Sequence, residues 1–212
     1  MVSGVSNNKS TGNVSGQKSN NNSPARKETK NEVKGNAQGT AGIKDVAPSN
    51  SGLKEGRLDA LTDAQDAART NKAFQPRDGK TYCNLGVAQT LKDIGIDVTD
   101  EKVGISNPKN GQAYLANKIA DNLSESAKKE DGYWQKIDAK KAQKLANEGF
   151  PVVGAFKGSP HGHVVTVRPE GYDKGLSSEN GGVIVNNIGS NNVVQNDTRP
   201  FSYYAQRNTQ GY

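Results

Sequence analysis

Apolar residues recur at helical spacing in four stretches of the chain, which predicts four helices. The first covers residues 57–70, with leucine and alanine on one side and aspartate and arginine on the other. We expect this helix to pack loosely on the rest of the domain. The second begins at or just after Cys83 and ends at Gly95, and the others cover residues 113–123 and 139–147.

Beyond Gly149 the pattern changes to short runs of β-branched residues. Gly, Pro and Asn separate these runs, as is typical of antiparallel strands joined by turns. The runs cover residues 151–156, 164–167 and 183–185. Because helices precede strands along the chain, we expect an α+β domain in which an N-terminal helical layer carries the cysteine and packs on an antiparallel β-sheet.

The beginning of the chain has a different composition. Residues 1–55 contain no Phe, Tyr or Trp and are dominated by Ser, Asn, Gly and Lys, so they bury too little apolar surface to offset the entropy of ordering. We therefore predict a disordered arm at 1–55 and a single folded domain at 56–212. All of the aromatic residues fall in that second part.

The net charge of +6 belongs mostly to the arm. Its basic residues are dispersed singly among Asn and Ser, without an arginine cluster or interleaved aromatic rings, which argues against nucleic-acid binding. The chain lacks a run of about 18 apolar residues, so we predict no membrane span. It also begins without the apolar segment of a secretory signal, so we expect any export to use another route.

Cys83 is the only cysteine, so the chain forms no internal disulfide. Its predicted place at a helix start is typical of a reactive thiol, because the unpaired amides and the positive end of the helix dipole favour a thiolate. The polar neighbours Thr81 and Asn84 agree with that interpretation, and a buried structural thiol is the alternative. Any histidine base must be His161 or His163, the only two histidines.

Cysteine hydrolysis requires a thiolate, an imidazole within hydrogen-bond reach and a third group that orients the imidazole. His163 opens the predicted strand 164–167, and Asn187 ends the next strand along the chain. Strand alternation places Asn186 and Asn187 on opposite faces, so only one of them can point at His163. We choose Asn187 and keep Asn186 as its rival.

This ordered set resembles the papain-like cysteine hydrolases of the CHAP and NlpC type, which cut amide bonds in peptidoglycan. The resemblance covers about residues 80–190, and its motifs are Tyr82-Cys83-Asn84-Leu85, Trp134, the helix-strand unit 142–156 and Gly162-His163-Val164. It implies that Cys83 is the nucleophile, His163 the general base and Asn187 the orienting residue. The third position varies within this superfamily.

The resemblance also implies a papain-like fold and a cysteine amidase or endopeptidase that acts on peptidoglycan stem peptides without a cofactor. Such an enzyme would be a phage-type lytic enzyme or a secreted antibacterial effector. It would be exported without a classical signal peptide, would work in the periplasm or outside the cell, and would have an immunity or inhibitor protein as a possible partner.

Three further residues are candidate substrate contacts. Tyr82 precedes the nucleophile, and His161 lies in the loop before the strand because Pro160 and Gly162 flank it. Trp134 is typical of a stacking residue at a cleft rim, but it suits a core anchor better. At the helix start, an adjacent imidazolium should lower the pKa of the nucleophilic thiol to about 3.5–7.5.

Three alternatives remain open. His161 and His163 could bind zinc if Asp173 or Cys83 supplied a third ligand, although the chain has no further histidine. A papain-like toxin acting on host proteins, as a protease, deamidase or acyltransferase, would share the same cysteine and histidine. A non-catalytic binding module would leave Cys83 with an ordinary thiol pKa.

Overall fold

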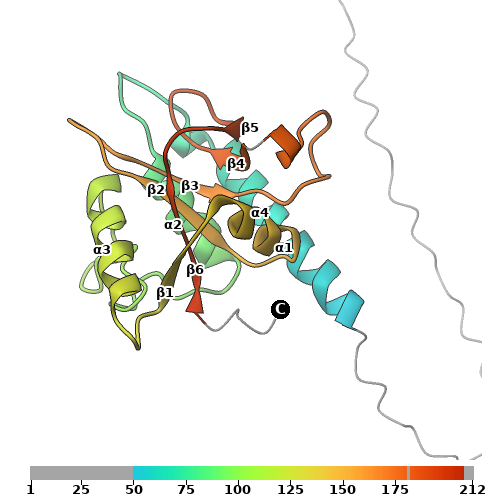
Figure 1. Cartoon of the computed structure of the whole chain (residues 1–212). Helices are drawn as coiled ribbons and strands as arrows, with labels where there is room; N and C mark the ends of the chain where they lie inside the picture. Colours follow the sequence, from blue (N-terminus) through green and yellow to red (C-terminus); the bar gives the residue numbers. More distant parts are fainter. Residues whose placement is uncertain (1–49, 181, 208–212) are drawn as a thin grey trace, which may run out of the picture. The chain divides into compact units, whose positions relative to one another are not determined.

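A computed structural model of the chain describes residues 50–180 and 182–207. Within these residues the protein has four α-helices and a six-stranded antiparallel sheet (Figure 1). The helices are α1 (Asn50–Thr70), α2 (Cys83–Asp93), α3 (Ala116–Lys128) and α4 (Ala139–Asn147). The strands are β1 (Trp134–Ile137), β2 (Val152–Phe156), β3 (His163–Val167), β4 (Val183–Asn187), β5 (Val193–Asp197) and β6 (Ser202–Gln206). The predicted α+β class is confirmed.

Three helices depart from their predicted bounds, and one of them is α2, which ends at Asp93 instead of Gly95. α1 begins at Asn50, whereas the apolar pattern predicted a start at residue 57. α3 begins and ends later than the predicted 113–123, and α4 has the predicted bounds. The first 49 residues of the expected arm lie outside the described residues. Among the described helices, none is both long and apolar enough to cross a membrane.

The strands follow the order β1-β6-β2-β3-β4-β5, and every neighbouring pair is antiparallel. The three strands that the sequence predicted, β2, β3 and β4, lie next to one another in this order. β1, β5 and β6 were not predicted, and β1 precedes α4, so the helices do not all come before the strands.

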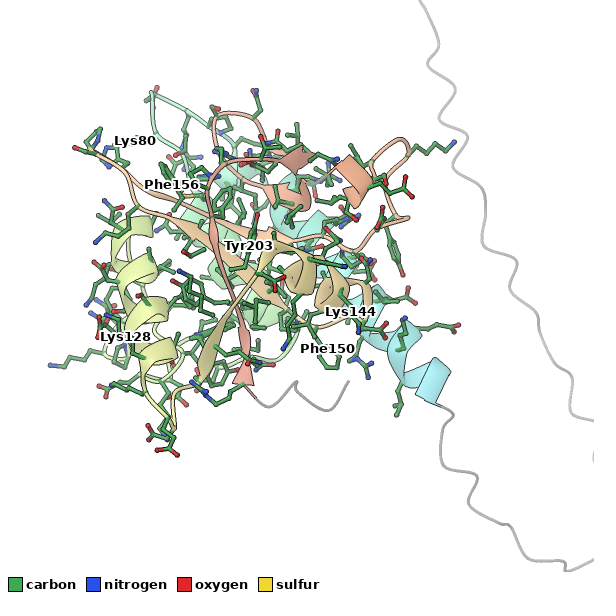
Figure 2. All side chains as sticks on the ribbon, in the orientation of Figure 1. Lys80, Lys128, Lys144, Phe150, Phe156 and Tyr203 are labelled. Atoms are coloured by element: carbon green, nitrogen blue, oxygen red, sulfur yellow. The ribbon has the colours of Figure 1, made fainter. Side chains whose placement is uncertain are left out.

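Helices cover both faces of the sheet (Figure 1). Alternation along β3 sends Val164 toward a core shared with α2 and α3, and Val165 and Val167 toward a core shared with α4. Figure 2 labels Phe150, Phe156 and Tyr203, which pack in this second core. The nucleophile candidate belongs to the first core, on α2.

Buried polar contacts attach α1 to the sheet, so the expected loose packing is wrong. The Gln65 side chain is completely buried, and its Nε2 donates to Thr166 Oγ1 at 3.1 Å and to the Val167 carbonyl at 2.8 Å. The Arg168 guanidinium is buried as well and lies 3.1 Å from Asp66 of the same helix. Because a buried polar group is costly without a partner, these bonds specify where α1 lies.

Candidate active site

Cys83 is the first residue of α2, which confirms the predicted helix start. Its side chain is buried, with 6% of the residue exposed. The backbone N–H groups of Cys83, Asn84 and Val164 lie near enough to the sulfur to favour its thiolate. Because Val164 follows His163, the sulfur lies between the start of the helix and the start of β3.

Gly86 lets α2 approach the end of β4. A Cβ atom on Gly86 would lie 2.2 Å from Ile188 Cδ1, which is far inside contact distance. Ile188 directly follows Asn187, the last residue of β4. The absence of a side chain at Gly86 therefore brings the helix that carries Cys83 close to the strand that carries Asn187.

His163 and Asn187 meet across neighbouring strands. His163 Nε2 lies 2.7 Å from Asn187 Oδ1, and Asn187 Nδ2 donates to the Asn191 carbonyl at 2.7 Å. A backbone carbonyl can only accept, so it identifies the nitrogen end of the Asn187 amide and leaves the oxygen facing the ring. His163 Nε2 therefore carries the proton, and Nδ1 keeps the lone pair that a general base needs.

Asn186 points to the other side of the sheet. Its Nδ2 donates to the Gln65 carbonyl of α1 at 3.0 Å. Its Oδ1 is buried and has no hydrogen-bond partner in the part of the chain that the structure describes. Of the two candidate asparagines, only Asn187 reaches His163.

Burial shifts the pKa values of both candidate catalytic groups. It raises the pKa of the Cys83 thiol, and this outweighs the three backbone N–H groups and the charge of Arg199, which favour the thiolate. Burial also lowers the pKa of His163, against the opposing effect of the hydrogen bond that the ring donates to Asn187. Both shifts favour a neutral thiol beside a neutral imidazole. The expected low thiol pKa is wrong in this structure, because burial outweighs the helix start.

An open groove of about 430 Å³ borders the nucleophile candidate. Residues 79–85 before and within α2, 115–117 at the start of α3 and 160–162 before β3 form its walls. Tyr82 and His161, two of the predicted substrate contacts, are among the residues that line it. The groove therefore offers a substrate direct access to the start of α2.

The lining of this groove is basic and apolar. Lys80 contributes a charge, and no aspartate or glutamate is among the described residues that line the groove. Figure 2 shows Lys80 at the same end of the molecule as Phe156, the last residue of β2. Leu115 lies on the wall with 74% of its surface exposed, which is unusual for a large apolar residue. Such a lining favours a ligand that carries both a carboxylate and apolar groups.

Asn117 holds the loop that leads into β3. Its Nδ2 donates to the Gly158 carbonyl at 3.0 Å, and its Oδ1 accepts from the Gly158 N–H at 3.2 Å. A Cβ atom on Gly162 would lie 2.3 Å from Asn117 Oδ1 and 2.5 Å from the Phe156 carbonyl. Only glycine fits directly before His163, and the fixed loop keeps His161 at the groove.

Trp134 lies in the core and not at the groove. It is completely buried, and its indole Nε1 donates to the Val103 carbonyl at 2.8 Å. The edge of the ring packs against Tyr133. Trp134 is therefore a core anchor, and its candidate role as a substrate contact is corrected.

The structure does not support the zinc alternative, because the described residues offer no set of metal ligands. Among residues 50–180 and 182–207, no three His, Cys, Asp or Glu side chains are grouped so that they could hold a metal ion. Asp173, one of the third ligands considered, is paired with the Arg168 guanidinium at 2.9 Å.

Two charged residues close to His163 and Asn187 were not predicted from the sequence. Asp197 ends β5, and Arg199 follows two residues later. Arg199 Nε donates to the carboxylate of Asp197, and Arg199 Nη2 lies 3.3 Å from Asn187 Oδ1. In the sequence, the aspartate and the arginine stand two residues apart, shortly after a pair of valines. Because β5 was not predicted, this pattern did not show that the two residues lie near Asn187.

No protein-family model matches this chain, and no curated protein matches it in sequence. The assignment of a function therefore depends on the geometry of Cys83, His163 and Asn187 and on the groove beside them.

Proposed function

We propose that this protein is a papain-like cysteine hydrolase in which Cys83 is the nucleophile, His163 the general base and Asn187 the orienting residue. One observation carries the proposal: the Asn187 amide, oriented by the Asn191 carbonyl, accepts from His163 Nε2 at 2.7 Å and leaves Nδ1 as the base. The papain-like fold is supported by a helix that begins at the cysteine and packs on a sheet whose strand begins at the histidine.

The reaction follows from these atoms. The Cys83 sulfur attacks the carbonyl carbon of an amide while His163 Nδ1 takes the thiol proton, and N–H groups at the start of α2 stabilise the oxyanion. The imidazolium then gives its proton to the departing amine, which leaves a thioester on Cys83. Water attacks the thioester with His163 as base, the acid is released and the thiol is restored. The raised pKa of the Cys83 thiol and the lowered pKa of His163 favour neutral groups at rest, which supports proton transfer in step with the attack.

The groove supports a substrate of a particular kind. Lys80 and His161 line it, none of its lining residues within 50–180 and 182–207 is acidic, and Leu115 adds an exposed apolar surface. Stem peptides of peptidoglycan combine free carboxylates with small apolar residues. Together with the motifs that resemble cell-wall hydrolases, this supports a cysteine amidase or endopeptidase acting on stem peptides. We place its action in the cell-wall compartment, as a phage-type lytic enzyme or a secreted antibacterial effector with an immunity or inhibitor protein as partner.

Purified peptidoglycan sacculi provide the test. After incubation with the protein, mass spectrometry of the soluble muropeptides should reveal new amino and carboxyl termini at one kind of amide bond. Cys83→Ala and His163→Ala should release none, whereas Lys128→Ala, which alters an exposed ion pair on α3, should release as much as the wild type.

Two outcomes would contradict the proposal in different ways. Intact sacculi together with thioester formation at Cys83 on a host protein would move the substrate to proteins, as in the toxin alternative. Intact sacculi together with a Cys83 that forms no acyl adduct with any activated ester would exclude the hydrolase.

A further inference from the structure

The oxygen of the Asn187 amide faces two donors. His163 Nε2 lies 2.7 Å from Oδ1, and Arg199 Nη2 lies 3.3 Å from the same atom. A guanidinium can only donate, just as the Asn191 carbonyl at the other end of the amide can only accept. The two neighbours therefore specify the same orientation of the Asn187 amide from opposite ends.

Arg199 is itself held in place. Its Nε donates to the carboxylate of Asp197, at 2.9 and 3.0 Å from the two oxygens, and its Nη2 donates to Asp197 Oδ2 as well. The Asp197 side chain is only 3% exposed. Asp197 also accepts from the backbone N–H of Arg199 and from Gln195 Nε2. Such a charge-assisted, two-point contact fixes the plane of a guanidinium.

Phe201 completes this arrangement. The guanidinium carbon of Arg199 lies 5.1 Å from the centre of the Phe201 ring, and the His163 ring lies 6.1 Å from the same centre. One aromatic ring thus packs against both the base and the cation. The charge of Arg199 therefore has a defined position relative to the imidazole.

We infer that Arg199 is a positioning residue for His163, because it keeps the Asn187 oxygen aimed at Nε2. Asp197 holds Arg199 in place and moderates its charge. The inference rests on the proposed function, because it gives Arg199 a part in that reaction. Arg199 acts through Asn187 and is not itself a catalytic residue.

The charged groups that face His163 act in opposite directions. After burial, the charge of Arg199 lowers the pKa of His163, whereas Asp197 raises it. Cys83 on α2 is the titratable group at the other side, and the positive charge of Arg199 also favours its thiolate. Removing Arg199 should therefore raise the pKa of His163, and neutralising Asp197 should lower it.

Nuclear magnetic resonance of histidine labelled with ¹⁵N tests this directly. The chain has two histidines, so a His161→Asn variant assigns the spectrum. In the wild type, His163 should be the Nε2–H tautomer. Arg199→Gln should raise the pKa of His163, Asp197→Asn should lower it, and Lys128→Gln, which removes an exposed and distant charge, should leave it unchanged.

Kinetics on a soluble stem peptide provide the second readout. For Arg199→Gln, the acid limb of the pH profile of kcat/KM should move in the direction of the His163 pKa. The maximum of kcat/KM should fall by about 10- to 100-fold, as when a partner behind an oriented imidazole is removed. Arg199→Lys keeps the positive charge but loses the planar guanidinium that donates to Asp197 and Asn187 together. The pKa of His163 should therefore stay near the wild-type value while kcat/KM still falls.

The outcomes separate the inference from the proposed function. If Arg199→Gln leaves the tautomer and pKa of His163 unchanged, the inference is wrong, even where the wild type hydrolyses the peptide. If the wild type hydrolyses nothing, the proposed function fails while the resonance experiment still decides the contacts of Arg199. Should Arg199→Gln not fold, Arg199→Lys replaces it, and an unchanged kcat/KM in that variant overturns the positioning role.

Discussion

Gly86 and Ile188 meet at a distance that leaves no room for a side chain between α2 and the end of β4. A Cβ atom on Gly86 would lie 2.2 Å from Ile188 Cδ1. Gly86 lies about one helical turn after Cys83, and Ile188 directly follows Asn187. This contact between the backbone of α2 and the Ile188 side chain thus sets how close the nucleophile candidate lies to the residue that orients its base.

Gly86→Ala should therefore lower both stability and activity. Forcing a methyl group into this contact should cost about 1–3 kcal/mol of unfolding free energy and shift α2 relative to β4. Urea denaturation and peptide hydrolysis measure the two effects. Gly56→Ala is the matched control, because Gly56 is an exposed residue of α1 with no atom within 4 Å of the added Cβ. That variant should gain up to about 1 kcal/mol, and a similar gain for Gly86→Ala would contradict the close contact.

The two neighbouring asparagines should separate function from stability. Asn187→Ala should lower kcat/KM by about 10- to 100-fold, less than the complete loss in Cys83→Ala, because the ring loses its orientation but the nucleophile remains. Asn186→Ala should instead cost about 1–3 kcal/mol of stability, because the Gln65 carbonyl loses its donor. Thermal melts and kinetics on the folded fraction distinguish them, and a large loss of kcat/KM in folded Asn186→Ala would return the orienting role to that residue.

Alkylation of Cys83 by iodoacetamide should be slow at acidic pH. Because burial raises the pKa of the thiol, the thiolate fraction at each pH is smaller than that of a free thiol, and the rate should rise through a midpoint above the ordinary cysteine value. His163→Ala should abolish hydrolysis but move this midpoint little, since a neutral imidazole does not stabilise a thiolate. His161→Ala should do neither. Alkylation faster than that of a free thiol at pH 6 would mean that a thiolate and an imidazolium are already paired at rest.

Arg168→Met should detach α1 from the sheet at a large cost. The buried guanidinium is paired with Asp66 and Asp173, and removing one partner of a buried pair costs about 3–5 kcal/mol. We expect the lower end of that range, because both carboxylates are partly exposed. The control is Lys128→Met, which breaks an exposed pair with Glu125 and should cost less than about 1 kcal/mol. Equal midpoints of urea denaturation in the two variants would show that the Arg168 pairs do not hold α1.

The parts of the fold that the sequence predicted are those with strong local patterns. The start of α2 at Cys83, the bounds of α4 and the buried strands β2 to β4 all follow from spacing, caps and β-branched runs. β5 escaped because Gln195, Asn196 and Asp197 interrupt its apolar pattern and its residues are mostly exposed or half-buried at the edge of the sheet. β1 has only four residues, too few for alternation to be recognised.

The candidate site divides in the same way. Cys83, His163 and Asn187 stand at element ends that the pattern marks, so their meeting could be anticipated from neighbouring strands. The direction of the thiol pKa could not be anticipated, because it depends on the burial of Cys83 in the folded domain more than on the helix start. Arg199 could not either, because its contact with Asn187 depends on β5 pairing with β4.

The attachment of α1 has a mechanical consequence. Gln65 bonds to Thr166 of β3 and accepts from Asn186 of β4, and Asn192 donates to the Arg69 carbonyl near the end of the same helix. Tension applied through the chain that precedes Asn50 would therefore be transmitted to β3 and β4, the neighbouring strands that carry the histidine and the asparagine. Pulling α1 away would break these bonds first, so a stretched molecule would lose its catalytic geometry before its sheet came apart.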